Sequence, residues 1–423
     1  MDNYYKVADT TSTITDSFNY KAIKNSNTCD AISPSGAVKL LVLPIEFTDY
    51  TCSSQTLTDL NTALNGSGVT DTGYWESLAS FYKKSSFGKF TPSYTVASKY
   101  VSGLTPAQFY AKETSSVPAS SWILEQALAN YKSVTGDSCT QFDHDGDGLI
   151  DAVILVYCCP DYSKDTAIKA IDTQGNVFWA YCYWDYDNYA NASKTSPIGL
   201  NYFWMSYDFL YEEAASPKVD AHTLIHESGH LMGLDDCYSY DSKTLGSSKV
   251  YPAPMGGADM MDENVIDHDA FSKLALNWVK PYVVTGNSRI TINPAESSGD
   301  CIVIPAKGST WNGTAFDEYL LIELYTPTGL NALDAKIHYP HSVLGYGVRL
   351  WHVDARLAKY SYSSSGELQS IAYVEGSPAT LDYDDLSYFS IAACNTASLR
   401  EGEALDLGYN EVSLIQAGHP ENT

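Results

Sequence analysis

The sequence predicts a mixed α+β domain followed by an all-β, sandwich-like domain. Up to about residue 282, apolar runs of strand length alternate with segments whose apolar residues recur at helical spacing. Beyond it, short β-type runs are separated by Gly, Pro, Ser and Asn. A chain of 423 residues is also too long for one ordinary core. We therefore expect an irregular segment over residues 1–36, a first domain over residues 37–282 and a β-rich domain over residues 283–423.

Five segments define the first domain. Residues 38–47 (VKLLVLPIEF) and 152–159 (AVILVYCC) are continuous apolar runs and predict buried strands. Residues 75–87 and 120–134 carry apolar side chains on one helical stripe, and a glycine follows the first of them at position 88. Residues 269–282 predict a further helix that stops at a proline. We expect the strands to form a twisted mixed sheet with helices packed on it.

The composition excludes several classes of protein. The formal net charge of −26 makes nucleic acid and anionic membranes unfavourable partners. No apolar run approaches the ~18 residues that a membrane span needs. Residues 1–13 have neither a basic nor an apolar region of the kind that a signal peptide requires. The nine cysteines include no C-x-x-C pair, which excludes a zinc ribbon but leaves one or two disulfides open.

The stretch HTLIHESGHLMGLDDCYSYD, from His222 to Asp241, predicts a metal site on a helix. His226 and His230 are four residues apart, so their imidazoles lie on one helical face and can grip one Zn²⁺. Glu227 is placed to reach a metal-bound water and act as a general base. His222, one turn earlier, is expected to support the site or the core. The alternative is a pair of core histidines on an amphipathic helix.

The third ligand is expected after a turn. Gly233 can adopt a positive φ and end the helix, which lets the chain turn back under the metal. Asp236 is then the expected third ligand, with Asp235 as an alternative. Glu263, in ENVID, is the ligand in a rival, thermolysin-like arrangement. Three protein ligands leave one position open for water, which is typical of a catalytic site. In a metzincin-type site a methionine turn lies under the metal, and Met255 in PAPMGG is the candidate.

With these motifs, the sequence resembles the secreted bacterial metallopeptidases of the immune inhibitor A family. The resemblance runs from residue 38 to about residue 354 through VKLLVLPIEF, FYKKSSFGKF, DHDGDGLIDAV, HESGHLMGLDDCY, MGG, DAFSKLALNW, EYLLIELY and GYGVRLWHVD. It implies a metzincin-like fold and a secreted or cell-surface location. It also implies zinc ligation by His226, His230 and Asp236, with Glu227 as base and Met255 in the methionine turn. Ser228 and Asp235 depart from the family's pattern, at positions that are not ligands.

The loop DHDGDGLID predicts a structural Ca²⁺ site. Asp143, Asp145 and Asp147 stand at alternate positions before a glycine, as in the front half of a calcium loop. Ile154 stands where a bidentate glutamate is expected, so Asp151 and the carbonyl of Leu149 are the candidates for the remaining ligands. The resemblance also favours calcium here. The alternative is a solvated acidic turn.

Three further residues are candidates for the substrate cleft. Tyr238 and Tyr240 follow the third zinc ligand and can donate to an oxyanion, although structural roles are common for tyrosine. His268 either lines the cleft or begins a surface helix.

The function expected from these motifs is zinc-dependent endopeptidase activity on extracellular proteins or peptides. The alternative is a catalytically weak or inactive relative that binds a cell-surface glycan or protein through its β-domain. The sequence sets neither the cleavage preference nor the oligomeric state.

Overall fold

The computed structural model divides into two compact units, and each is described by itself. The N-terminal unit comprises residues 30–84 and 88–232, and the C-terminal unit comprises residues 1–29, 85–87 and 233–423. The residues that the structure describes are 32–69, 75–115, 117–184, 190–211, 219–238, 243–245, 248–250, 255–257, 259–284, 286–306, 311–337, 345–362, 368–373, 389–391 and 412–414.

The N-terminal unit is built on one mixed sheet in the order β2-β1-β5-β8-β6, with β3 also paired to β1. All its pairings are parallel except that of β6 with β8. The strands are β1 (Lys39–Glu46), β2 (Ser93–Val96), β3 (Tyr100–Val101), β5 (Val153–Tyr157), β6 (Tyr181–Trp184) and β8 (Asn201–Ser206). The two predicted apolar strands are thus confirmed as β1 and β5, which are neighbours.

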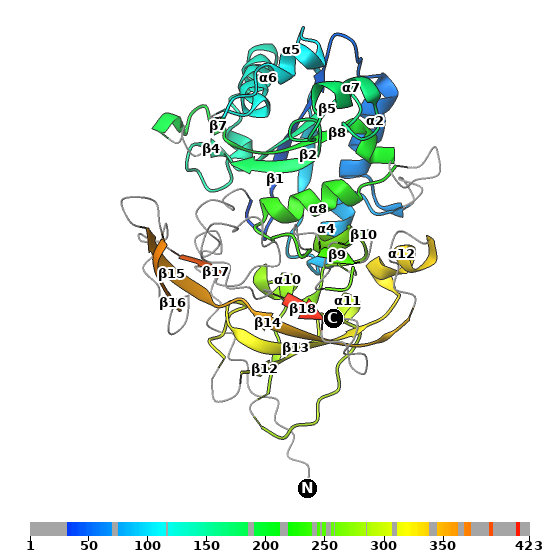
Figure 1. Ribbon diagram of the computed structural model, residues 1–423, viewed down its shortest axis with the longest axis vertical. Coiled ribbons are helices and arrows are strands. Elements are labelled where there is room, and N and C mark those ends of the chain that lie inside the picture. Colours follow the sequence, from blue (N-terminus) through cyan, green and yellow to red (C-terminus); the bar gives the residue numbers. More distant parts are fainter. Residues whose placement is uncertain are drawn as a thin grey trace. The chain divides into compact units, whose positions relative to one another are not determined.

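Both faces of this sheet are covered, which explains why its central strands read as continuous apolar runs. On one face Leu41, Val153 and Trp204 belong to a core cluster with Ile123 of helix α6 (Ala119–Thr135). Helix α8 (His222–Leu231) contacts β6 and β8. Figure 1 shows α6 and α8 on opposite sides of the central strands. The sheet therefore holds α8 on a rigid support.

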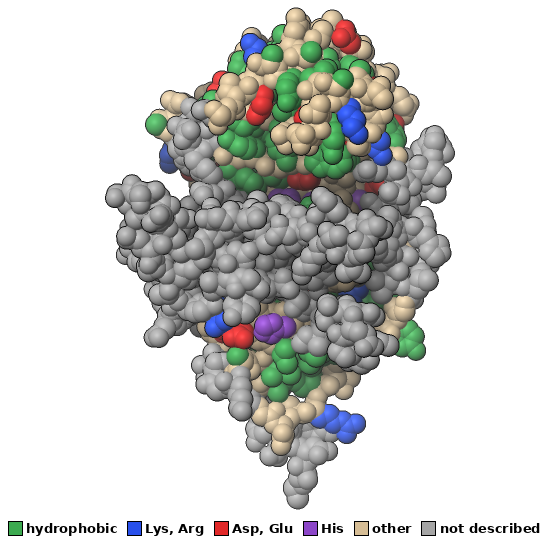
Figure 2. Space-filling model, in the orientation of Figure 1, with side chains coloured by type: hydrophobic (Ala, Val, Ile, Leu, Met, Phe, Trp, Pro, Cys, Tyr) green, Lys and Arg blue, Asp and Glu red, His purple; other side chains and the backbone are tan. Residues whose placement is uncertain are grey.

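Shorter elements complete the N-terminal unit. The helices are α2 (Ser54–Asn65), α4 (Leu78–Ser85), α5 (Pro106–Tyr110), α7 (Thr166–Ile171), η2 (Thr140–Phe142) and η4 (Tyr207–Tyr211), and β4 (Leu149–Ile150) pairs with β7 (Ile198–Gly199). The helices predicted over residues 75–87 and 120–134 correspond to α4 and α6. On the face drawn in Figure 2, acidic and basic side chains are scattered singly over the described part of this unit, without a continuous charged patch.

In its described residues, the C-terminal unit combines three sheets with short helices. Its largest sheet has the order β11-β12-β13-β14-β18. The strands are β9 (Lys243–Leu245), β10 (Ser248–Val250), β11 (Tyr282–Val283), β12 (Cys301–Pro305), β13 (Glu318–Tyr325), β14 (Gly347–Asp354), β15 (Leu357–Tyr362), β16 (Leu368–Tyr373), β17 (Phe389–Ile391) and β18 (Val412–Leu414). The helices are α9 (Met260–Glu263), α10 (Ala270–Ala275), α11 (Ala295–Ser298), η5 (Gly329–Asn331) and α12 (Ala332–Ile337).

The architecture is therefore mixed α/β, with several sheets and no barrel within the described ranges. The described part of the region beyond residue 283 is rich in strands, with the short helices α11 and α12 between them. The predicted helix over residues 269–282 is shorter than expected. This helix is α10, which ends at Ala275. Asn277 adopts a φ of 58°, and a residue with this left-handed backbone conformation cannot continue a right-handed helix.

The compact units differ from the predicted division, because residues 233–282 belong to the C-terminal unit. One reason is the docking of α10 on the largest sheet, where Ala270 N donates to Glu323 Oε2 of β13 over 3.1 Å.

Of the irregular segment expected over residues 1–36, residues 1–31 lie outside the described residues. No helix in the described part is long and apolar enough to span a membrane.

Two acidic residues lie together where β5 and β8 end. Because these strands are parallel neighbours, Asp161 and Asp208 emerge at the same edge of the sheet, and Asp161 N donates to Asp208 Oδ2 over 3.1 Å. Asp161 is 1% exposed. Burial, together with the charge of Asp161, raises the pKa of Asp208 to about 6. A disulfide between Cys52 and Cys158 joins the chain after β1 to the chain after β5 at this edge.

We expect Asp208→Asn to stabilise the protein at neutral pH. A carboxyl whose folded pKa is raised from 3.8 to about 6 contributes stability that is complete below about pH 4 and is lost as the pH rises through 6. The variant's free energy of unfolding should exceed that of the wild type by on the order of 2 kcal/mol at pH 8 and match it near pH 4. Urea unfolding across this range measures the difference. Exposed Asp49→Asn is the charge-matched control, and a pH-independent difference for Asp208→Asn would contradict the prediction.

Candidate metal centre

Helix α8 carries the histidine motif and is buried along nearly its whole length. Its start is held by Asp220, whose Oδ1 accepts from His222 N over 2.9 Å and lies 2.6 Å from His222 Nδ1. The His222 ring stacks on Trp75, with centroids 4.6 Å apart. Farther along, Tyr82 donates its hydroxyl to the carbonyl oxygen of Ile225 over 2.6 Å. His222 is therefore a buried support of the helix.

His226 and His230 face the same point, as their spacing predicts. Their Nε2 atoms lie 3.1 Å apart. Two Zn–N bonds of about 2.0–2.1 Å in a tetrahedral site separate the nitrogens by roughly 3.3 Å, so the two imidazoles are close to the spacing that one zinc ion requires. His226 is buried and His230 is partly exposed. The two ring nitrogens are therefore placed where they could hold one ion between them.

The turn after α8 brings a carboxylate to the histidines. Gly233 adopts a φ of 98°, and the helix ends at Leu231 as expected. One ligand atom each from His226, His230 and Asp236 lies within 4.8 Å of the others, and Asp236 is buried. The two alternatives do not belong to such a group among the residues the structure describes: Asp235 is half-buried, and Glu263 is exposed. The geometry thus favours Asp236 as the third ligand.

Glu227 is a buried carboxylate beside the two histidines in sequence. The thiol of Cys182, on β6, lies 3.5 Å from Glu227 Oε2 and 3.2 Å from the Glu227 carbonyl oxygen. Nothing in the spacing of the motif indicates this neighbour, because 45 residues separate the two positions. The contact arises from the packing of α8 on β6.

The aspartate loop also gathers carboxylates, within the N-terminal unit. Oxygen atoms of Asp143, Asp145 and Asp151 lie within 4.8 Å of one another. Asp147 is not in this group; its Oδ1 accepts from Leu149 N over 2.8 Å. Asp143 accepts from the backbone N–H of residues 146, 147 and 148, and glycines at 146 and 148 have positive φ, which makes the tight turn possible. The loop can therefore present three of the predicted side chains to a cation.

Met255 is the candidate for the methionine turn, and Tyr238 and Tyr240 are candidates for the substrate cleft. Met255 is fully buried in a turn whose Gly256 and Gly257 have φ of 76° and 68°. Gly257 N donates to Asp262 Oδ2 over 2.7 Å, which fixes that turn. Tyr238 is partly exposed, and Tyr240 lies outside the described residues. The roles expected for these three residues stay predictions.

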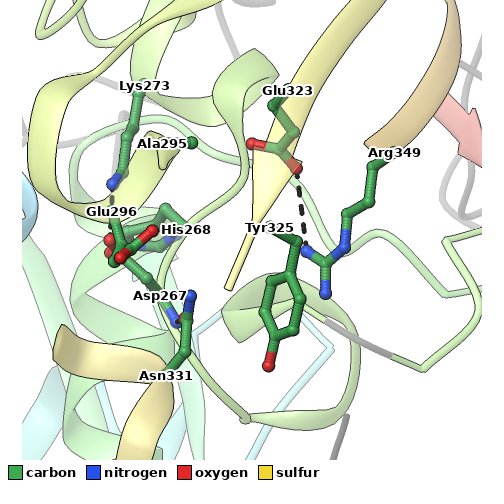
Figure 3. A pocket seen from close by; sticks show the side chains of 9 residues that line it. All are labelled: Asp267, His268, Lys273, Ala295, Glu296, Glu323, Tyr325, Asn331 and Arg349. Carbon is green, nitrogen blue, oxygen red and sulfur yellow. Dashed lines mark hydrogen bonds and ion pairs between the residues drawn. The ribbon is translucent and has the colours of Figure 1, made fainter. Parts of the chain in front are cut away.

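His268 lies in a small charged pocket of the C-terminal unit and is 3% exposed, so it does not begin a surface helix. Figure 3 shows this pocket, in which Lys273 pairs with Asp267 and Arg349 with Glu323 at 3.7 Å. None of the three candidate zinc ligands lines it. The expectation that His268 lines a substrate cleft stays a prediction.

The sequence is matched by no protein-family model and by no curated protein.

Proposed function

We propose that this protein is a zinc-dependent endopeptidase that acts on extracellular proteins or peptides. The observation that carries the proposal is the convergence of His226, His230 and Asp236 on one point, with the Glu227 carboxylate on the same buried helix. Three side-chain ligands are what catalytic zinc sites use, whereas structural sites close the fourth position with a protein ligand. The resemblance to the immune inhibitor A family supports the same assignment and a metzincin-like fold.

The donor set fits zinc, since two imidazoles and a carboxylate are ligands that this ion accepts. When bound, Zn²⁺ would supply a Lewis acid that lowers the pKa of a water molecule and polarises the substrate carbonyl. Glu227 accepts the proton of the attacking water and then donates it to the nitrogen of the departing amine. Asp220 and Tyr82 form hydrogen bonds with α8 at its start and middle, so the imidazole rings of the two histidines keep their orientation during the reaction.

We also propose that Ca²⁺ binds the aspartate loop and stabilises the N-terminal unit without taking part in the chemistry. The loop leads into β5, the central neighbour of β1 and β8. Without a cation, the gathered carboxylates repel one another at the start of this strand. Oxygen ligands on a tight turn suit calcium, whereas magnesium demands a smaller octahedral shell.

We expect Glu227→Gln to keep zinc and fold but to lose at least ~100-fold in the rate of casein or gelatin cleavage, because a positioned general base contributes about that much or more. Chelation should abolish the wild-type activity, and added zinc should restore it. Atomic absorption checks the metal content of the variant. A zinc-replete wild type that cleaves neither substrate would contradict the proposed function, and undiminished cleavage by the variant would remove Glu227 from its role.

Asp236→Ala should lose zinc under dialysis, whereas Glu263→Ala should retain it. The reason is that Asp236 is buried beside the histidines and Glu263 is exposed outside the ligand group. Removing one of three ligands weakens binding strongly, and the exposed glutamate serves as a carboxylate-matched control. Zinc content after equal dialysis decides between them, and the reverse result would assign the third ligand to Glu263.

Calcium should raise the melting temperature of the wild type but not that of Asp145→Asn. At a concentration ~100 times Kd, binding favours the folded state by about 2.7 kcal/mol. Exposed Glu125→Gln on α6 removes the same charge and should respond like the wild type. Magnesium should substitute poorly. Equal calcium responses in all three proteins would mean that the loop is only an acidic turn.

A further inference from the structure

Cys182 lies against Glu227, and no feature of the metal motif accounts for this contact. Its sulfur is 3.2 Å from the Glu227 carbonyl oxygen and 3.5 Å from Oε2 of the same residue. The thiol is partly exposed and forms no disulfide with another described cysteine. A thiol is a weak donor, and both oxygens are acceptors, so the S–H group points toward Glu227 in either case.

The sheet sets this contact. Cys182 pairs with Phe203 across β6 and β8, so the two side chains lie on the same face of the sheet. Phe203 is fully buried, and α8 packs against both strands. The neighbours of Cys182 along β6 point to the opposite face, since successive strand residues alternate. Cys182 therefore lies on the face of β6 that α8 covers, and from there its side chain reaches the Glu227 carboxylate.

We propose that Cys182 is a positioning residue that holds the Glu227 carboxylate in its working orientation; this rests on the proposed peptidase function. A glutamate side chain has several rotatable bonds, and fixing it before the reaction lowers the entropy cost of proton transfer. A lysine or arginine at this place would also fix the carboxylate, but its positive charge would stabilise the ionised form and weaken the base. A neutral thiol is a weak donor, so it fixes the side chain with a smaller effect on the strength of the base.

The first test compares kcat in zinc-replete Cys182→Ala and Cys182→Ser. Loss of one hydrogen bond to the base should lower kcat of the alanine variant by about 3–10-fold, with KM and zinc content unchanged. The serine hydroxyl is also a donor, so Cys182→Ser should recover kcat to within about twofold of the wild type. Buried Cys139→Ala is the matched control, because it removes a thiol from the core of the same unit, and kcat should not change.

Equal kcat in Cys182→Ala and the wild type would overturn the positioning role while leaving the peptidase function intact. A serine variant as slow as the alanine variant would also overturn it, since the sulfur would then act by its volume. A zinc-replete wild type without peptidase activity would instead remove the proposed function, and the positioning role with it.

A second measurement tests the contact and needs no activity. The rate at which iodoacetamide alkylates Cys182 is followed by peptide mass mapping at pH 7.5 in the wild type and in Glu227→Gln. A carboxylate beside a thiol disfavours the thiolate, so removing its charge should speed alkylation by at least about threefold. An unchanged rate would mean that Glu227 does not lie against Cys182 in solution, and the proposal would fall.

Discussion

The burial of α8 is the constraint on which the rest of the N-terminal unit depends. A helix that carries histidines and a glutamate into the interior must have its polar groups satisfied there, because an unsatisfied buried polar atom costs about 1–3 kcal/mol. The structure meets this requirement for several of these groups, although the buried hydroxyl of Ser228 has no hydrogen-bond partner among the described residues. The Asp220 carboxylate accepts a hydrogen bond from the backbone N–H of His222 at the start of the helix, and the Tyr82 hydroxyl donates one to a backbone carbonyl in its middle. The sheet supplies Cys182 against Glu227.

Charge is the second constraint on this molecule. The chain is strongly acidic, and part of that charge is buried: Asp161 and Asp208 meet where two parallel strands end. In the C-terminal unit, Asp259 and Asp269 are also buried, and burial raises the pKa of both carboxyls, to about 7 for Asp259. Lys273 and Arg349 balance other carboxylates in the same unit. In this unit, raised carboxyl pKa values, the buried Lys273 and the partly buried Arg349 therefore accompany the acidic interior.

The sequence predicted those features that depend on short spacings. Two histidines four residues apart must share a helical face, and Gly233 was expected to take the positive φ that it has. Continuous apolar runs predicted β1 and β5 because central parallel strands are buried on both faces. The approach of Cys182 to Glu227 could not be predicted, because it depends on which strand lies at the edge of the sheet. The compact units differ in extent from the predicted domains, because the docking of α10 on β13 joins residues about fifty positions apart.

The supports of α8 come from far along the chain, and this separation has a consequence for folding kinetics. His226, His230 and Asp236 fall within one short stretch, so the chain can bring them near one another at little entropic cost. Tyr82, by contrast, is 143 residues from the carbonyl it binds, and the parallel pairing of β1 with β5 also joins distant segments. Non-local pairings of this kind close large loops and slow the search for the native state. The ligands are therefore local in sequence, whereas the contacts that orient the helix close large loops of the chain.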